Sequence, residues 1–97
     1  MKKYQVKSVD MDEYVGLEAK VAIDGKEYDI AEQMMETEDG IERGGADCYY
    51  FINGKENPNF SDALPAKDEE EGRELYNSII ESMIELYEAG RRSAMQS

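Results

Sequence analysis

The sequence predicts an α+β domain, a small antiparallel sheet of about four or five strands packed against one long C-terminal amphipathic helix. Two dipeptides, Asp24-Gly25 and Asn53-Gly54, each follow an apolar run and predict the turns of two β-hairpins. After residue 68 the spacing of apolar residues changes from two to three and four, the period of a helix. A chain of 97 residues has the length of one domain, which we expect to span residues 1–92 with a frayed tail at 93–97.

The first hairpin is predicted by both its strand pattern and its turn. Residues 15–23 carry an apolar side chain at every second position, which is typical of a strand with one buried face. The Asp-Gly dipeptide that follows fixes the register of the returning strand, and puts its apolar side chains on the same buried face. The expected pairs are Ile23 with Lys26, Val21 with Tyr28, and Ala19 with Ile30.

Further strands are predicted on both sides of this hairpin. Residues 4–9 alternate apolar and polar and predict a first strand, with the acidic residues 10–13 as its turn. Residues 31–36 either extend the hairpin strand or form a short helical turn, and the glycines of 37–45 predict a loop. The aromatic run 48–52 predicts another strand, and the proline after the second turn limits its partner to a brief edge strand.

Residues 68–90 are predicted to form the helix. Acidic residues fill its first turn and Arg91 and Arg92 follow its end, the polarity that the helix dipole favours. Pro65 lies before the start and Gly90 lies near the end. Its apolar stripe consists of Leu75, Tyr76, Ile79, Ile80, Met83, Ile84, Leu86 and Tyr87.

The charge balance restricts the partners. Acidic residues outnumber basic ones by 23 to 11, and with no histidine the net charge is −12 at pH 7. This charge favours basic partner proteins and disfavours direct binding to nucleic acid or to anionic membranes. Cys48 is the single cysteine, so we expect no internal disulfide, and neither a signal peptide nor a membrane span is evident. We therefore expect a cytoplasmic protein.

The residue types that catalysis needs are scarce. The chain has no histidine to act as a general base or to activate Cys48, which lies in an apolar run and is expected to be a core residue. Gly-x-Ser-x-Gly and phosphate-loop motifs are absent. Paired carboxylates act on glycosidic bonds across a cleft, for which so small a domain has little room. We expect a non-enzyme without metal or cofactor. Calcium binding is a third alternative. It is a weaker one, because residues 36–47 lack the alternating ligands of a calcium loop.

The acidic excess is concentrated in two segments. Residues 31–62 hold eight acidic and two basic residues, net −6, and residues 63–97 hold eight and four, net −4. At 1.5 Å rise per residue, Glu81, Glu85 and Glu88 of the predicted helix follow one another at about 6 and 5 Å along its axis. A solvated helix face is the alternative explanation for such a row. The candidate partner-binding acids are Glu36, Glu38, Asp39 and Glu42 in the central segment, and Glu74, Glu81, Glu85 and Glu88 on the helix.

Tyr49 is a further candidate for partner binding. In a strand, Tyr49 and Tyr50 point to opposite faces, so one of the two is expected to face solvent. An exposed tyrosine among acids provides contact area at a low cost in side-chain entropy. Packing of its ring on the outer face of the sheet is an equally good alternative.

These features favour an inhibitor or modulator that occupies a basic, nucleic-acid-binding surface of a partner protein. In charge, size and lack of catalytic groups the chain resembles small acidic inhibitors of phages and mobile elements, including DNA mimics that block restriction or CRISPR nucleases. Two alternatives stay open: a structural protein that acts through homo-oligomerisation, for example as a homodimer, and a small acidic domain with a housekeeping role.

Overall fold

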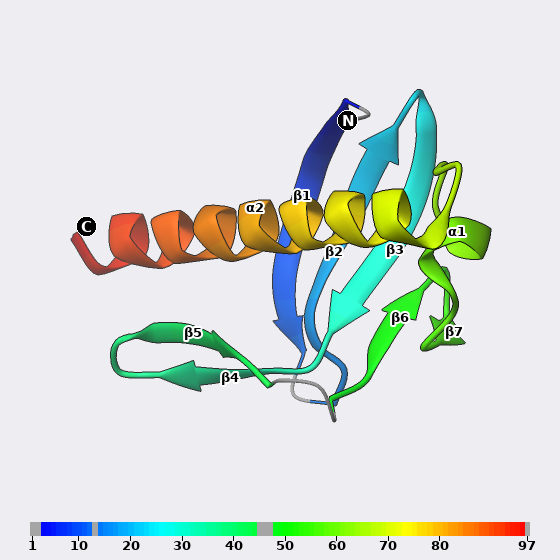
Figure 1. Cartoon of the computed structure of the whole chain (residues 1–97). Coiled ribbons are helices and arrows are strands. Elements are labelled where there is room, and N and C mark those ends of the chain that lie inside the picture. The colour runs from blue at the N-terminus through cyan, green and yellow to red at the C-terminus, as the bar shows by residue number, and fades with distance from the viewer. Residues whose placement is uncertain (1–2, 13, 45–47, 97) are drawn as a thin grey trace.

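The computed structural model describes residues 3–12, 14–44 and 48–96, with side chains as far as Arg91. The elements are β1 (Tyr4–Asp12), β2 (Gly16–Ile23), β3 (Lys26–Glu32), β4 (Met34–Thr37), β5 (Gly40–Arg43), β6 (Tyr50–Ile52), β7 (Lys55–Glu56), α1 (Phe60–Ala63) and α2 (Glu69–Gln96). A five-stranded antiparallel sheet has the order β1-β2-β3-β6-β7, and β4 and β5 form a separate two-stranded sheet. The long helix α2 lies across one face of the larger sheet (Figure 1). The predicted α+β class is confirmed.

Both predicted hairpin turns are confirmed. Strands β2 and β3 pair in the expected register, with Ile23 opposite Lys26 and Val21 opposite Tyr28. Asp24 and Gly25 have φ of 51° and 83°, and Asn53 and Gly54 have φ of 54° and 81°. Positive φ at both central residues is the requirement of a type I′ turn, which matches the twist of the strands that it joins.

Strand β1 is longer than predicted. The expected turn at residues 10–13 is wrong, because β1 stays paired with β2 as far as Asp12, opposite Gly16. Met11 lies opposite the fully buried Leu17 and packs against the core, so continued pairing buries apolar surface. The Asp12 carboxylate accepts hydrogen bonds from the backbone N–H groups of Tyr14 and Val15 at 2.8 and 3.2 Å. The chain therefore turns after Asp12.

Residues 34–43 form a hairpin, so the loop predicted for residues 37–45 is wrong over β5, and residues 34–36, for which a strand extension or a helical turn was expected, belong to the separate strand β4. Strands β4 and β5 pair from Met34 with Arg43 to Thr37 with Gly40. The Thr37 hydroxyl donates to the carbonyl of Gly40 at 2.8 Å and accepts from the N–H of Asp39 at 3.2 Å, which closes the turn. The glycine that indicated a loop supplies a positive φ of 132° at this turn. The hairpin runs beside the C-terminal half of α2, beyond the edge of the larger sheet (Figure 1).

Helix α2 starts close to the predicted residue and continues past the predicted end, as far as Gln96. A glycine ends a helix when it adopts the left-handed conformation, and Gly90 does not. The short helix α1 was not predicted. It is held by the Glu69 carboxylate, which accepts from the N–H groups of Phe60 and Ser61 at 3.2 and 2.9 Å. These backbone hydrogen bonds lower the pKa of Glu69.

The core lies between α2 and the facing side of the larger sheet. Leu86, part of the predicted stripe, is exposed because α2 there extends beyond the larger sheet. Each large side chain in this layer contributes about 1.5–3 kcal/mol by burial. Among the described residues, no helix is long and apolar enough to cross a membrane. The buried residues include Leu17, Val21, Ile23, Ile30 and Ile52 from the sheet and Leu75, Tyr76, Ile79, Ile80 and Met83 from α2.

Candidate functional site

Two of the predicted partner-binding acids attach the β4–β5 hairpin to α2. The Glu36 carboxylate accepts a hydrogen bond from the Tyr87 hydroxyl at 3.2 Å and pairs with Arg91 at 3.1 Å. The Glu88 carboxylate accepts from the N–H of Ile41 at 2.8 Å. Burial is the main cause that raises the pKa of Tyr87, and the hydrogen bond to Glu36 raises it further. Glu36 and Glu88 therefore join two elements of the chain, which leaves them less available to a partner than free carboxylates.

A buried carboxylate that sequence reasoning missed anchors the base of the same hairpin. Glu32 is 8% exposed, and its two oxygens accept hydrogen bonds from Arg43 Nε and Nη2, both at 2.7 Å. The Tyr76 hydroxyl also donates to it at 2.7 Å, and Arg43 reaches Asn77 at 3.2 Å. Burial and the adjacent carboxylate raise the pKa of Tyr76 strongly. The signal was present, because Glu32 continues the inward alternation of Tyr28 and Ile30.

Four glutamates form an outer stripe on α2, on the side away from the core. At 100° per residue they lie within about 60° of one another, and they extend over about 22 Å of the helix. Between residues 70 and 88 the helix itself places Asn77 and Ser78 and no Lys or Arg on this face. Arg43 of β5 reaches Asn77 from the hairpin and lies in the field of Glu81. Among the described side chains, none of the four forms an ion pair. The outer stripe consists of Glu70, Glu74, Glu81 and Glu85, all exposed, and its first member was not among the predicted candidates.

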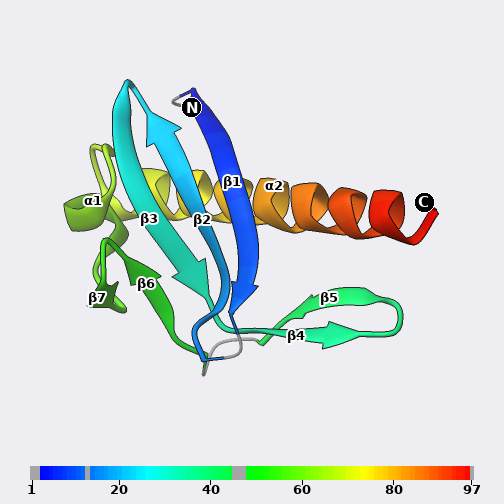
Figure 2. The same ribbon diagram turned by 180° about the vertical axis from the view of Figure 1, so that it is seen from behind.

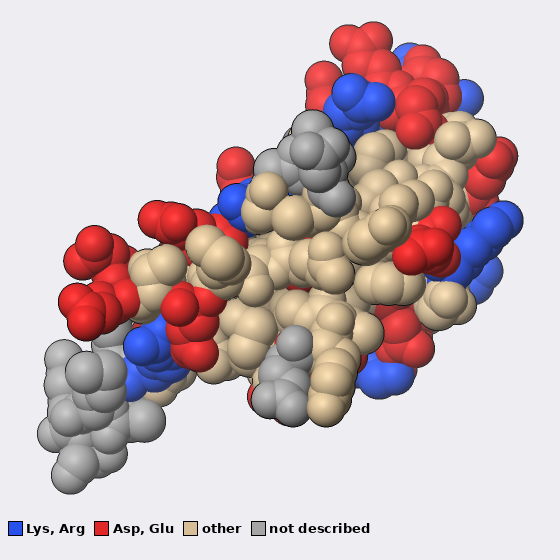
Figure 3. Space-filling model, turned by 90° about the horizontal axis from the view of Figure 1, so that it is seen from below, with Lys and Arg blue, Asp and Glu red and all other residues tan. Residues whose placement is uncertain are grey.

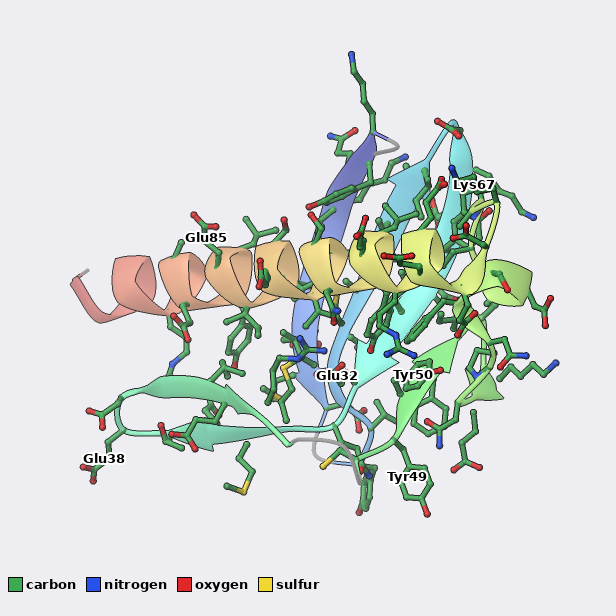
Figure 4. All side chains as sticks on the ribbon, in the orientation of Figure 1. Glu32, Glu38, Tyr49, Tyr50, Lys67 and Glu85 are labelled. Carbon is green, nitrogen blue, oxygen red and sulfur yellow. The ribbon has the colours of Figure 1, made fainter. Side chains whose placement is uncertain are left out.

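The remaining acids of the central segment lie apart from the outer stripe. Glu38 and Asp39 are exposed at the turn between β4 and β5, and Glu42 is exposed on β5 opposite Met35. Figure 4 shows Glu38 pointing away from α2, and Glu85 on the side of α2 away from the hairpin. Seen from below, acidic side chains gather towards the two ends of the molecule, with uncharged surface between them (Figure 3). The structure therefore separates Glu38, Asp39 and Glu42 from the outer stripe, whereas Glu36 and Glu88 both lie where the hairpin contacts α2.

Tyr49 lies beside an apolar part of the surface. Its side chain is 46% exposed, while Tyr50 is half-buried and stacks on Phe60 with ring centroids 4.9 Å apart. The large hydrophobic side chains of Tyr14 and Met35 are 82% and 62% exposed. Both line a shallow hollow of about 430 Å³, together with the half-buried Cys48. This surface offers apolar contact area, and the carboxylates of Asp12 and Glu36 also line the hollow.

In the described part of the chain, no three His, Cys, Asp or Glu side chains lie together as metal ligands would. Comparisons with protein families, with curated proteins and with solved structures found no match. The described surface offers charge on the outer stripe and apolar contact around Tyr14 and Met35.

Proposed function

We propose that the chain is a non-enzymatic inhibitor or modulator that occupies a basic, nucleic-acid-binding surface of a partner protein. The observation that carries this proposal is the outer stripe of α2, four exposed carboxylates on one face of one helix without a described ion pair. A rigid helix presents these charges at fixed positions, so a partner with a complementary row of Lys and Arg meets them without reordering either surface.

The arrangement within the outer stripe is unfavourable for the free helix. Glu70 with Glu74 and Glu81 with Glu85 are like charges four residues apart, which cost a helix about 0.2–0.5 kcal/mol per pair. The same helix has an opposite pair at this spacing, Glu69 with Arg73. A basic partner would neutralise the repulsion in the outer stripe, so the free energy that this repulsion costs the free helix would favour the complex.

A surface that normally holds a phosphate backbone is the partner that fits this field best. Such surfaces carry several Lys and Arg side chains in a row, each placed to neutralise one negative charge. A row of carboxylates on a helix competes with the nucleic acid for those side chains. The proposed activity is therefore competitive exclusion of nucleic acid, in the manner of the phage and mobile-element inhibitors that the composition resembles.

Capture from a nuclease-treated bacterial lysate tests this proposal. The immobilised chain is expected to retain nucleic-acid-binding proteins at low salt and to release them as ionic strength rises, because exposed charges are screened. A variant with Gln at all four positions of the outer stripe should retain about tenfold less, at roughly 0.4 kcal/mol for each exposed contact.

The matched control changes the net charge equally at other exposed acids: Glu27→Gln, Glu38→Gln, Asp39→Asn and Glu42→Gln. This control is expected to keep most of the capture. Equal losses in the two variants, capture that is insensitive to salt, or a captured set without nucleic-acid-binding proteins would each contradict the proposal.

The apolar surface around Tyr14, Met35 and Tyr49 favours a second candidate function, homo-oligomerisation in a structural role. Light scattering behind size-exclusion chromatography discriminates between the two candidates. A dimer that persists at about 1 M salt supports the structural role, because apolar contacts are not screened. If the chain acts through the outer stripe alone, we expect a monomer at every ionic strength.

A further inference from the structure

The face of the larger sheet opposite α2 is uncovered, and we refer to this surface of β1, β2, β3 and β6 as the open face. Figure 2, which views the molecule from behind, shows no described element lying over it. The open face is hollowed to a volume of about 830 Å³, and none of the lining residues belongs to α2. Side chains that line this hollow include Asp10, Glu18, Lys20, Asp29, Ala31 and Phe51.

The charges of the open face are arranged unequally across its strands. Lys20 lies directly opposite Asp29 across β2 and β3, and the two form an ion pair. Across β1 and β2, in contrast, Asp10 lies directly opposite Glu18, and both side chains are exposed. The Asp10 carboxylate accepts a hydrogen bond from the N–H of Met11 at 2.9 Å, and Lys20 lies in the field of Glu18. Because Lys20 is already paired with Asp29, part of the like-charge repulsion between the opposite carboxylates remains. A cation between the two carboxylates would remove the repulsion.

The floor of the hollow next to Glu18 is apolar. Ala31 lies opposite Glu18 on one side and opposite Phe51 on the other, so these three residues form a row across β2, β3 and β6. Ala31 is buried and Phe51 is half-buried. A ligand that fits must therefore combine a positive charge with an apolar or flat surface.

An arginine side chain has this combination. Its planar guanidinium binds carboxylates through paired hydrogen bonds, stacks on aromatic rings and is more weakly hydrated than an ammonium group. A lysine ammonium is strongly hydrated and lacks the flat face. The charge and the floor of the hollow thus select arginine over lysine.

We infer that the open face binds an arginine-bearing segment of a basic partner protein, with one guanidinium at Asp10 and Glu18 and the guanidinium of a neighbouring arginine over Ala31 and Phe51. This inference does not rest on the outer stripe, which lies on the other layer of the domain. It assigns the chain a second binding surface, directed away from the first.

Titration of a fluorescein-labelled hexa-arginine peptide, followed by anisotropy and by amide chemical shifts, tests this inference. At about 50 mM salt, where screening is weak, the peptide is expected to shift amides of β1, β2, β3 and β6, and a hexa-lysine peptide should bind more weakly. The double variant Asp10→Asn, Glu18→Gln should weaken binding about tenfold, the loss of a paired guanidinium contact. Its melting temperature should not fall, because the variant removes a repulsion, so weaker binding cannot be ascribed to unfolding.

The matched control is Glu38→Gln, Asp39→Asn, which changes the net charge equally at the turn between β4 and β5, outside the open face and the outer stripe, and is expected to alter the affinity less than about twofold. Phe51→Leu should bring the affinity for hexa-arginine down to that for hexa-lysine. Equal losses in the two double variants, equal affinity for the two peptides, or shifts confined to α2 would overturn the inference. Self-association that the Asp10 and Glu18 changes abolish would overturn it as well, because a second copy would then occupy the open face.

Discussion

Replacing Gly16 by alanine is expected to cost more than about 3 kcal/mol, a large part of the roughly 5–15 kcal/mol that keeps a domain folded. Gly16 has a φ of 96°, a conformation that side chains strain. A Cβ atom at this position would lie 2.1 Å from the carbonyl oxygen of Glu32 and 2.7 Å from the Cα of Gln33. Both atoms belong to the backbone of the neighbouring segment, so no side-chain rotation relieves the clash.

Gly25→Ala is the matched control for this prediction. Gly25 lies at the other end of β2, has a φ of 83°, and has no atom within 4 Å of the position of a Cβ. Its replacement should cost only the backbone strain, about 1–2 kcal/mol. Urea denaturation followed by circular dichroism measures both free energies of unfolding. Equal losses in the two variants would show that positive φ, and not the contact with the end of β3, makes Gly16 necessary.

The parts of the fold that could be predicted are those whose determinants are local. An Asp-Gly or Asn-Gly turn between apolar runs specifies both the turn type and the register, so the pairing of Val21 with Tyr28 follows from adjacent residues. The β4–β5 hairpin could not be predicted in this way. It is held to α2 by contacts of Glu36, Ile41 and Arg43 with residues distant in sequence, and these contacts exist only after α2 has packed.

The candidate site was only partly predictable for the same reason. The positions of Glu74, Glu81 and Glu85 on one helix face follow from helical periodicity alone. The engagement of Glu36 and Glu88 with the chain itself depends on the hairpin, so a charge count could not reveal it. The prediction that β1 ends near residue 9 was wrong. With residues 10–13 as a turn, Asp10 does not lie opposite Glu18, so the like-charge pair of the open face could not be predicted.

Replacing Arg43 by methionine, with Glu32 retained, is expected to cost about 2–4 kcal/mol. Removing one partner of a buried ion pair costs about 3–5 kcal/mol, because the other charge stays buried without compensation. Here the cost is reduced, since the Arg43 side chain is 37% exposed and water can partly replace it. The Tyr76 hydroxyl, at 2.7 Å, would be the remaining donor to the Glu32 carboxylate.

A triple variant distinguishes the buried charge from lost packing. Glu32→Leu, Arg43→Met and Tyr76→Phe together remove the carboxylate and both of its donors, so no buried charge is left. Asn77, the other partner of Arg43, is only half-buried and can bond to water instead. Because apolar replacement of a whole buried network is often close to neutral, we expect this variant to recover all but about 1 kcal/mol. Urea denaturation measures the recovery, and amide exchange at Ile41 reports whether the hairpin stays attached to Glu88. A triple variant as unstable as Arg43→Met would contradict this expectation. The network would then stabilise the fold mainly through its polar contacts, and the unpaired Glu32 charge would not be the main cause of the loss in Arg43→Met.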